Sequence, residues 1–197
     1  VEYAEENGKT YAYYQPSEDS TDARVESITT AVEKGAKAVV MPGYLFADAV
    51  AQAQELFPEV TFIVLDTAPT GTPAKNTYSI FYQEEQAGYL AGYAAVKDGY
   101  TKLGFLGGMA VPAVVRYGFG FVQGADAAAK EMSIQVDIKY WYSDVFWPTD
   151  DIKNKMGSWF TEGTEVVFAC GGGIYLSAVA AAEEADRKII GVDVDQG

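Results

Sequence analysis

Residues 101–132 read TKLGFLGGMAVPAVVRYGFGFVQGADAAAKEM and contain signals for a strand, a turn and a helix in that order. It opens with a short apolar run, Lys102–Leu106, whose length and composition are typical of a strand buried on both faces. The glycine pair 107–108 then predicts a tight turn. The segment 112–131 begins with a proline, has helical apolar spacing and predicts a helix. The stretch therefore predicts a buried strand that leads through a glycine turn into a helix.

The same alternation of strand and helix runs along the rest of the chain. Short runs rich in Val, Ile, Phe and Tyr predict further strands, also buried on both faces, at Thr10–Gln15, Lys37–Met41, Val60–Asp66, Thr77–Tyr82, Ile134–Tyr142, Glu165–Cys170 and Lys188–Val192. Segments of helical period predict further helices at 21–34, 45–57, 84–98, 149–162 and 174–186. Such alternation is typical of parallel sheets with right-handed crossovers. The sequence therefore predicts an α/β fold built from doubly wound parallel sheets.

One connection lacks a helix and suggests a division into two domains. Thr67–Asn76 holds two prolines and a glycine and has no apolar period, so it predicts a loop between two strands. We expect an N-terminal α/β domain over 1–82 and a second one over 83–197, with a ligand cleft at the carboxyl ends of their strands. The segment 1–8 looks like the end of a helix where a strand would be expected, and residues 193–197 stop where a strand leaves its sheet. We therefore expect an internal piece of a longer protein, without the first strand of domain one and the C-terminal return to the hinge.

The composition excludes several classes of function. With 14 basic and 28 acidic residues, the formal net charge is −14, which makes nucleic acid a poor partner. The chain has no histidine, which excludes Ser-His-Asp and Cys-His catalysis and histidine-ligated metals. The single Cys170 cannot form an internal disulfide or a cysteine-type zinc site. We expect no cofactor, and a binding protein is favoured over an enzyme.

The glycines allow a structural and a functional interpretation. The glycines at 104, 107 and 108 match neither a dinucleotide-binding nor a P-loop motif, which favours a plain turn over a ligand-lining backbone. Gly118, Gly120 and Gly124 lie inside a predicted helix, where close packing against the sheet is the simpler interpretation. The run 171–173 opens the next helix, and its free N–H groups could equally serve a ligand or only begin the helix.

Four acidic residues and one aromatic residue are further candidates for ligand contact. Glu84 and Glu85 begin a helix, where they either complement its dipole or contact a ligand near the domain boundary. Asp193 follows a strand and could accept hydrogen bonds from two sugar hydroxyls, and the pattern does not separate it from Asp195. Phe146 lies beyond a strand in a polar loop, where it either stacks on a flat ligand or covers the loop itself.

Several segments together resemble one protein family. The segments GFLGGMAVPAVVRYGFGFVQGADAAAKE (104–131), EEQAGYLAGYAA (84–95), ACGGG (169–173) and IIGVDVDQ (189–196) are similar to the basic membrane protein family. Its members are purine-nucleoside-binding lipoproteins that serve ABC importers. The stretch YYQPSEDSTDARVESITTAVEKGAKAVVMPGYLFADAVAQAQELFPEVTFIVLD resembles the N-terminal domain of that family, so the likeness covers essentially the whole chain. The resemblance implies the type I periplasmic-binding-protein fold.

The resemblance also implies a ligand, partners and site residues. Its acidic contact falls on Glu84, its base-stacking aromatic on Phe146, its glycine-loop contact on Gly172 and its ribose-binding acid on Asp193. The expected function is to bind a purine nucleoside outside the cytoplasm, as a membrane-anchored lipoprotein, and to deliver it to ABC permease subunits. A sugar or other small-molecule receptor of the same fold, or the sensor domain of a regulator, is the alternative. An enzyme would need an activated nucleophile or base, for which the chain offers only carboxylates.

Overall fold

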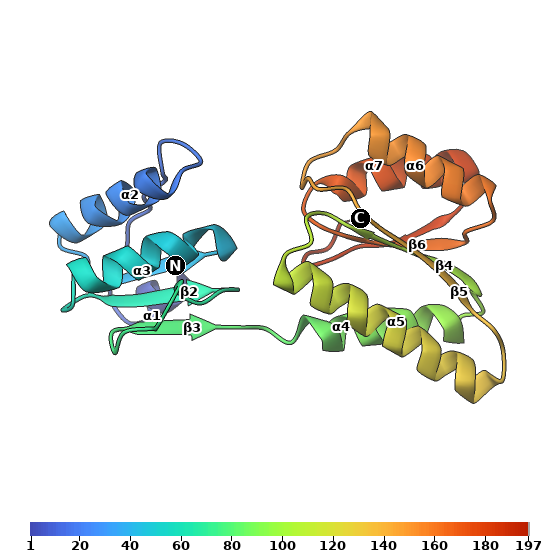
Figure 1. The fold of residues 1–197 in the computed structure, drawn as a ribbon, viewed down its shortest axis with the longest axis horizontal. Helices are drawn as coiled ribbons and strands as arrows, with labels where there is room; N and C mark the ends of the chain where they lie inside the picture. Colours follow the sequence, from blue (N-terminus) through green and yellow to red (C-terminus); the bar gives the residue numbers. More distant parts are fainter. Residues whose placement is uncertain (197) are drawn as a thin grey trace. The chain divides into compact units, whose positions relative to one another are not determined.

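The structure, a computed structural model, describes residues 1–196. The chain divides into two compact units, residues 1–82 (unit 1) and residues 83–197 (unit 2). Each unit holds its own parallel sheet, and Figure 1 shows the helices that cover each sheet. The parallel sheets confirm the α/β class expected from the sequence.

Unit 1 is built around a three-stranded parallel sheet with the order β1-β2-β3. Val40 of β1 lies opposite Ile63 of β2, which in turn lies opposite Tyr78 of β3. Ser20 begins the second helix by accepting a hydrogen bond from the backbone N–H of Ala23 at 3.2 Å. The elements of unit 1 are α1 (Glu2–Glu6), α2 (Thr21–Glu33), β1 (Ala38–Pro42), the 3-10 turn η1 (Tyr44–Phe46), α3 (Ala47–Leu56), β2 (Thr61–Leu65) and β3 (Thr77–Ile80).

The core of unit 1 lies on one face of its sheet. Figure 1 shows α2 and α3 together on that face, where Phe62 and Val64 of β2 are fully buried beneath them. On the other face Val40 is 57% exposed and Tyr78 is 59% exposed. The expectation of strands buried on both faces is therefore wrong for β1 and β3, because α2 and α3 pack on the same side of the sheet.

The strand predicted at Thr10–Gln15 is also wrong. The segment has no regular secondary structure, and its side chains Tyr11 and Tyr13 are 49% and 80% exposed. Thr and Tyr favour strands, but that preference depends on packing against a neighbouring strand. Within the described residues, no strand pairs with this segment. Its composition alone is therefore not sufficient to form a strand.

The predicted loop 67–76 connects β2 directly to β3 without a crossover helix. Two amide side chains hold it against the end of α3. Gln54 donates to the backbone oxygen of Thr72 at 3.0 Å and accepts from the backbone N–H of Ala74 at 2.9 Å. Asn76 donates to the backbone oxygen of Val60 at 3.0 Å. These bonds pair backbone groups at the ends of the connection and tie the loop to α3.

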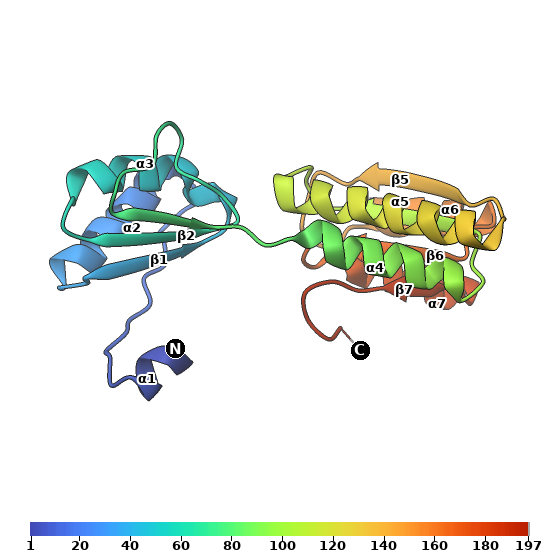
Figure 2. The same cartoon turned by 90° about the horizontal axis from the view of Figure 1, so that it is seen from below.

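Unit 2 contains a four-stranded parallel sheet with the order β5-β4-β6-β7. In Figures 1 and 2, α4 and α5 cover one face of this sheet, and α6 and α7 cover the other. The strands β5 and β7 are shorter than the runs that predict them. The elements are α4 (Glu84–Lys97), β4 (Lys102–Gly107), α5 (Pro112–Met132), β5 (Asp137–Tyr142), α6 (Asp150–Thr161), β6 (Val166–Cys170), α7 (Ile174–Ala185) and β7 (Lys188–Ile190).

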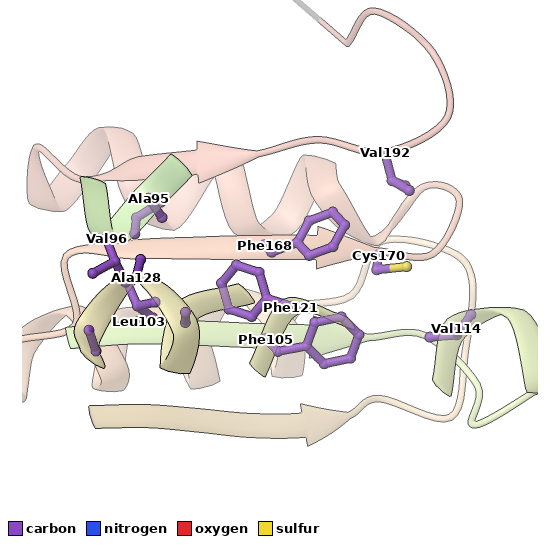
Figure 3. Packing of buried hydrophobic residues seen from close by; sticks show 13 residues of the cluster. Ala95, Val96, Leu103, Phe105, Val114, Phe121, Ala128, Phe168, Cys170 and Val192 are labelled. Carbon is purple, nitrogen blue, oxygen red and sulfur yellow. The ribbon is translucent and has the colours of Figure 1, made fainter. Parts of the chain in front are cut away.

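Three phenylalanine rings lie at the centre of the core between the sheet and the helices α4 and α5. Figure 3 shows Phe105 of β4, Phe121 of α5 and Phe168 of β6 directed toward one another. The ring centroids of Phe105 and Phe168 are 5.7 Å apart in an edge-to-face arrangement. Cys170 and Val192 extend the same core to the carboxyl end of the strands.

Glycines bring α4 and α5 into backbone contact. A Cβ atom placed on Gly92 of α4 would lie 2.0 Å from the backbone oxygen of Phe121, and one on Gly124 of α5 would lie 1.9 Å from that of Tyr89. The prediction that Gly120 and Gly124 pack on the sheet is therefore wrong, because they pack on α4. Gly118 does face the sheet, where it contacts the ring of Phe105.

Candidate functional site

The carboxyl ends of the four strands of unit 2 form the candidate site, because loops at this edge of a parallel sheet commonly bind ligands. Gly107 ends β4, and a glycine follows it. Residues 143–147 follow β5, the glycine run 171–173 follows β6, and Asp193 lies just beyond β7. Three of the four residues singled out from the sequence therefore follow strands of one sheet, at the same edge.

Phe146 lies against glycines from two neighbouring strands. A Cβ atom on Gly108, after β4, would lie 2.4 Å from Cδ1 of the Phe146 ring. The backbone oxygen of Phe146 accepts a hydrogen bond from the N–H of Gly173 at 2.7 Å. A Cβ atom on Gly172 would lie 3.0 Å from the same oxygen. The loop after β5 thus passes the end of β4 and reaches the glycine run after β6, which brings Phe146 and Gly172 together.

The ring of Phe146 is half-buried and packs against the phenylalanine core of unit 2. The Phe146 side chain therefore covers part of this core, and the residue as a whole stays partly accessible to solvent. Gly172 is exposed and has a φ of +50°. Trp147, the next residue of the loop, is 62% exposed. The loop therefore presents two aromatic rings beside an exposed glycine backbone.

Asp193 is an exposed carboxylate in a sharp turn after β7. Its φ of +65° lies in the left-handed region, which Asp tolerates better than most residues. Oδ1 of Asp193 accepts a hydrogen bond from the hydroxyl of Tyr117 at 3.2 Å. Tyr117 belongs to α5, so a helix on the face of the sheet holds a side chain from the turn that follows its last strand.

Burial and negative charge act on two groups near Asp193. Burial raises the pKa of Tyr117, and the charges of Asp193 and Glu84 raise it further. Burial likewise raises the pKa of the Cys170 thiol, with the same two carboxylates adding to the effect. Tyr117 and Cys170 are therefore protonated at neutral pH. Glu84 bonds Arg116 and Asp193 bonds Tyr117, and these two partners are adjacent in α5, so the two acids lie at the same end of unit 2.

Glu84 differs from the other predicted residues because it is buried and already paired. It is 5% exposed, and its Oε2 accepts a hydrogen bond from Nε of Arg116 at 2.6 Å. Burial alone would raise the pKa of Glu84, but the hydrogen bond from Arg116, the backbone N–H of Glu84 itself and the charge of Arg116 outweigh it, so that the pKa is lowered. Glu85 lies farther from the same guanidinium, with 3.9 Å between its Oε2 and Nε. Glu84 is thus an ionised carboxylate held by Arg116.

Sequence reasoning missed Arg116 and Tyr117. Both lie in the first turns of α5, and each contacts one of the predicted acids. The signal available in the sequence was a single arginine inside the otherwise apolar run VPAVVRYGFGF. A charged residue in a helix that packs on a sheet indicates a specific partner.

The part of the chain that the structure describes holds neither a metal-binding cluster nor a membrane-spanning helix. Residues 1–196 contain no group of three or more His, Cys, Asp or Glu side chains arranged to hold a metal ion. In the same part of the chain, no helix has both the length and the apolar character needed to cross a membrane.

Comparison with known proteins identifies the family. The model of the Bmp family, described as ABC transporter substrate-binding protein PnrA-like, matches residues 1–197. The chain belongs to this family. This confirms the resemblance found in the sequence. The chain is 30% identical over 198 residues to the ABC transporter nucleoside-binding protein BmpA of Lactococcus lactis, and the match covers 96% of this chain and 54% of that protein.

Other Bmp proteins and solved structures agree with this assignment. Basic membrane protein A1 of Borrelia garinii is 25% identical over 183 residues, which are 91% of this chain and 53% of that protein. The chain thus spans about half the length of the curated relatives it matches. A solute-binding protein of Aeropyrum pernix superposes with a TM-score of 0.81 at 20% identity, over 99% of this chain and 56% of that one. A solute-binding protein from Conexibacter woesei superposes with a TM-score of 0.75 at 22% identity, over 100% of this chain and 64% of that one. These likenesses confirm the periplasmic-binding-protein fold.

Proposed function

We propose that the protein is the extracytoplasmic substrate-binding component of an ABC importer and that it binds a purine nucleoside at the strand ends of unit 2. Membership of the PnrA-like family supports the transport role. The name of the Lactococcus lactis relative, nucleoside-binding protein BmpA, supports the class of ligand. The observation that carries the proposal is the position of Phe146 between Gly108 and Gly172, at the same sheet edge as Asp193.

Each residue has a distinct role in this proposal. Phe146 stacks on the purine base with the exposed part of its ring, since stacking on an aromatic ring suits a flat ligand. Gly172 offers backbone groups to the ligand, because it is exposed and has no side chain to block approach. Asp193 accepts hydrogen bonds from the two vicinal hydroxyls of the ribose.

Glu84 has a more restricted role in the proposal. Its carboxylate is bound by Arg116 and is 5% exposed, so it can offer only its remaining acceptor sites to a base edge or sugar hydroxyl. Its negative charge also contributes to the local field, as the raised pKa of Tyr117 indicates. We expect Glu84 to matter less for affinity than Asp193, which is exposed.

The proposal includes partners and a location. The permease subunits of the importer are the expected protein partners, and no nucleic acid is expected because the net charge is −14. We propose that the protein is anchored as a lipoprotein on the cell surface or in the periplasm. The name basic membrane protein, carried by several relatives, supports a membrane location. The protein binds its ligand without making or breaking a covalent bond.

A thermal-shift screen tests the proposed ligand. The purified protein is heated with inosine, guanosine, adenosine, uridine, hypoxanthine or ribose. Ligand at one hundred times Kd stabilises the folded state by about 2.7 kcal/mol, which corresponds to a shift of several degrees. We expect a shift with the purine nucleosides and none with ribose. A shift with ribose or another sugar alone would replace the proposal with the sugar-receptor alternative.

Isothermal titration of inosine against variants of Asp193 tests the site itself. Asp193→Ala should weaken binding by at least about 2 kcal/mol, because two ligand hydroxyls lose an ionised acceptor. The control is Asp186→Asn, since Asp186 is an exposed aspartate with a similar positive φ of +51° at the end of α7. Asp193→Asn is titrated as well as Asp193→Ala, because Asn, like Asp, tolerates a positive φ. Unchanged affinity in both Asp193 variants would remove Asp193 from the site.

A further inference from the structure

Tyr117 is the side chain that holds Asp193, and no role was expected for it. We propose that Tyr117 is a positioning residue, which fixes the Asp193 carboxylate so that its remaining acceptor sites face the ribose hydroxyls. The inference rests on the proposed function, because it assigns a role within the same nucleoside site. It adds a residue from α5, an element that contributed no predicted ligand contact.

The hydroxyl of Tyr117 has a position set by the core. Its ring packs edge-to-face on Phe168 of β6, with the centroids 5.9 Å apart and the planes at 82°. Phe168 is 2% exposed and contacts the rings of Phe105 and Phe121 in turn. A ring packed in this way has little rotamer freedom. The O–H group therefore reaches Asp193 from a fixed point.

The Asp193 backbone is also held in place. The preceding residue, Val192, is 7% exposed and belongs to the same core as Phe168. The N–H of Val192 donates to the side-chain oxygen of Gln196 at 3.0 Å, and the N–H of Val194 donates to the backbone oxygen of Val192 at 2.8 Å. With the turn fixed by these bonds, the main freedom left to Asp193 is rotation of its exposed side chain.

The hydrogen bond from Tyr117 removes that rotational freedom without using the whole carboxylate. It occupies one site on Oδ1, whereas an ionised carboxylate can accept about four hydrogen bonds. Burial and the charge of Asp193 raise the pKa of Tyr117, so the phenol stays protonated and donates at neutral pH. Oδ2 and the second site on Oδ1 remain for a vicinal diol. An acceptor oriented before binding costs the complex less entropy.

The test compares two tyrosine variants and two ligands. Tyr117→Phe keeps the ring that packs on Phe168 and removes only the O–H. The matched control is Tyr93→Phe, because Tyr93 donates to Glu131 at 2.8 Å near the far end of α5. Each variant is titrated with inosine and with 2′,3′-dideoxyinosine, which lacks the two vicinal hydroxyls of the ribose and keeps the 5′ hydroxyl. We expect Tyr117→Phe to weaken inosine binding about 3- to 10-fold, the effect of one lost hydrogen bond, and to leave dideoxyinosine binding unchanged.

The possible results separate this inference from the function on which it rests. If Tyr117→Phe binds inosine as tightly as the wild type, the positioning role is overturned and the nucleoside function stands. An equal loss for both ligands would show a general structural effect and would also overturn the positioning role. The double variant Tyr117→Phe/Asp193→Asn should bind inosine as tightly as Asp193→Asn alone, because the two residues act as one unit. Failure of the wild type to bind inosine would overturn the proposed function, and this role with it.

Discussion

Nε of Arg116 lies 2.6 Å from Oε2 of Glu84, and this ion pair joins the second turn of α5 to the first residue of α4. The Glu84 side chain is 5% exposed and that of Arg116 is 30% exposed. The pair is therefore more protected from solvent than the other ion pairs of unit 2. It fixes the starts of two helices whose remaining length is held together by glycine contacts.

Replacing Arg116 should destabilise unit 2. Arg116→Met leaves the buried Glu84 carboxylate without its partner, and we expect a loss of about 1–3 kcal/mol in the free energy of unfolding by urea. The control is Lys130→Met, because Lys130 pairs with Asp126 on the surface with side chains 76% and 57% exposed. That variant should lose less than about 0.5 kcal/mol. Equal stability of the two variants would mean that the Arg116–Glu84 pair contributes no more than a surface pair.

Acid should lower the folding stability of unit 2, because it protonates the Glu165 carboxylate. Oε2 of Glu165 accepts hydrogen bonds from the backbone N–H groups of Thr101 at 2.8 Å and Lys102 at 2.9 Å. The bond from Thr101 is the main cause that lowers the pKa of Glu165, and it outweighs the opposing effect of burial. A lowered pKa in the folded state gives stability that is present above the unfolded pKa of about 4.3 and is lost as the pH falls through the folded value.

The measurement is the urea midpoint of wild type and Glu165→Gln from pH 7 to pH 3. The variant should be less stable at pH 7 and should lose less stability on acidification, because it has no carboxylate to protonate there. Glu183→Gln, which changes an exposed acid on α7, serves as the control and should follow the wild type. Parallel curves for wild type and Glu165→Gln would exclude Glu165 as a source of acid sensitivity.

The contact between α4 and α5 should not tolerate a methyl group. Gly92→Ala would place a Cβ atom 2.0 Å from the backbone oxygen of Phe121, so the helices must separate. We expect a loss of at least about 1–3 kcal/mol in unfolding free energy. Gly157 of α6 is the matched control, because a Cβ atom there meets nothing within 4 Å. Gly157→Ala should stabilise the protein by about 0.5–1 kcal/mol, and a similar loss in both variants would contradict the packing argument.

Phe146 should affect the affinity for purine nucleosides and leave any response to ribose unchanged. Phe146→Ala removes the ring proposed to stack on the base, and we expect inosine binding to weaken by about 1–3 kcal/mol, measured by isothermal titration. Trp147→Ala is the comparison, since Trp147 is the adjacent loop aromatic and is 62% exposed. If Trp147→Ala causes the loss and Phe146→Ala does not, the stacking role belongs to Trp147. Circular dichroism of both variants checks that the fold is retained.

The secondary structure of unit 2 could be predicted closely because local signals agree with the fold. The helix predicted at 84–98 is observed as Glu84–Lys97, and the strand predicted at 165–170 as Val166–Cys170. Their boundaries follow from apolar period and glycine position, which act over a few residues. The strand predicted at Thr10–Gln15 does not form, because a strand needs a neighbouring strand to pair with, and the local sequence does not specify one.

The candidate site could be predicted only in part. The strand-end positions of Phe146, Gly172 and Asp193 follow from the alternation of elements, because parallel strands bring their carboxyl ends to one edge. The pairing of Glu84 with Arg116 could not be predicted in this way. It joins residues 32 positions apart on two helices, and its distance depends on how closely those helices approach.

The α/β class, the family and the order of the elements from residue 21 onward follow from the amino-acid sequence, since these depend on short-range patterns and on the similarity of whole segments. Which side chains hold the acids depends on the packing of the folded chain: Arg116 binds Glu84 and Tyr117 binds Asp193. The reason is that the close packing of α5 on α4 and on β6 sets the direction of its side chains. Such packing depends on contacts between residues distant in the chain, and no local pattern encodes it.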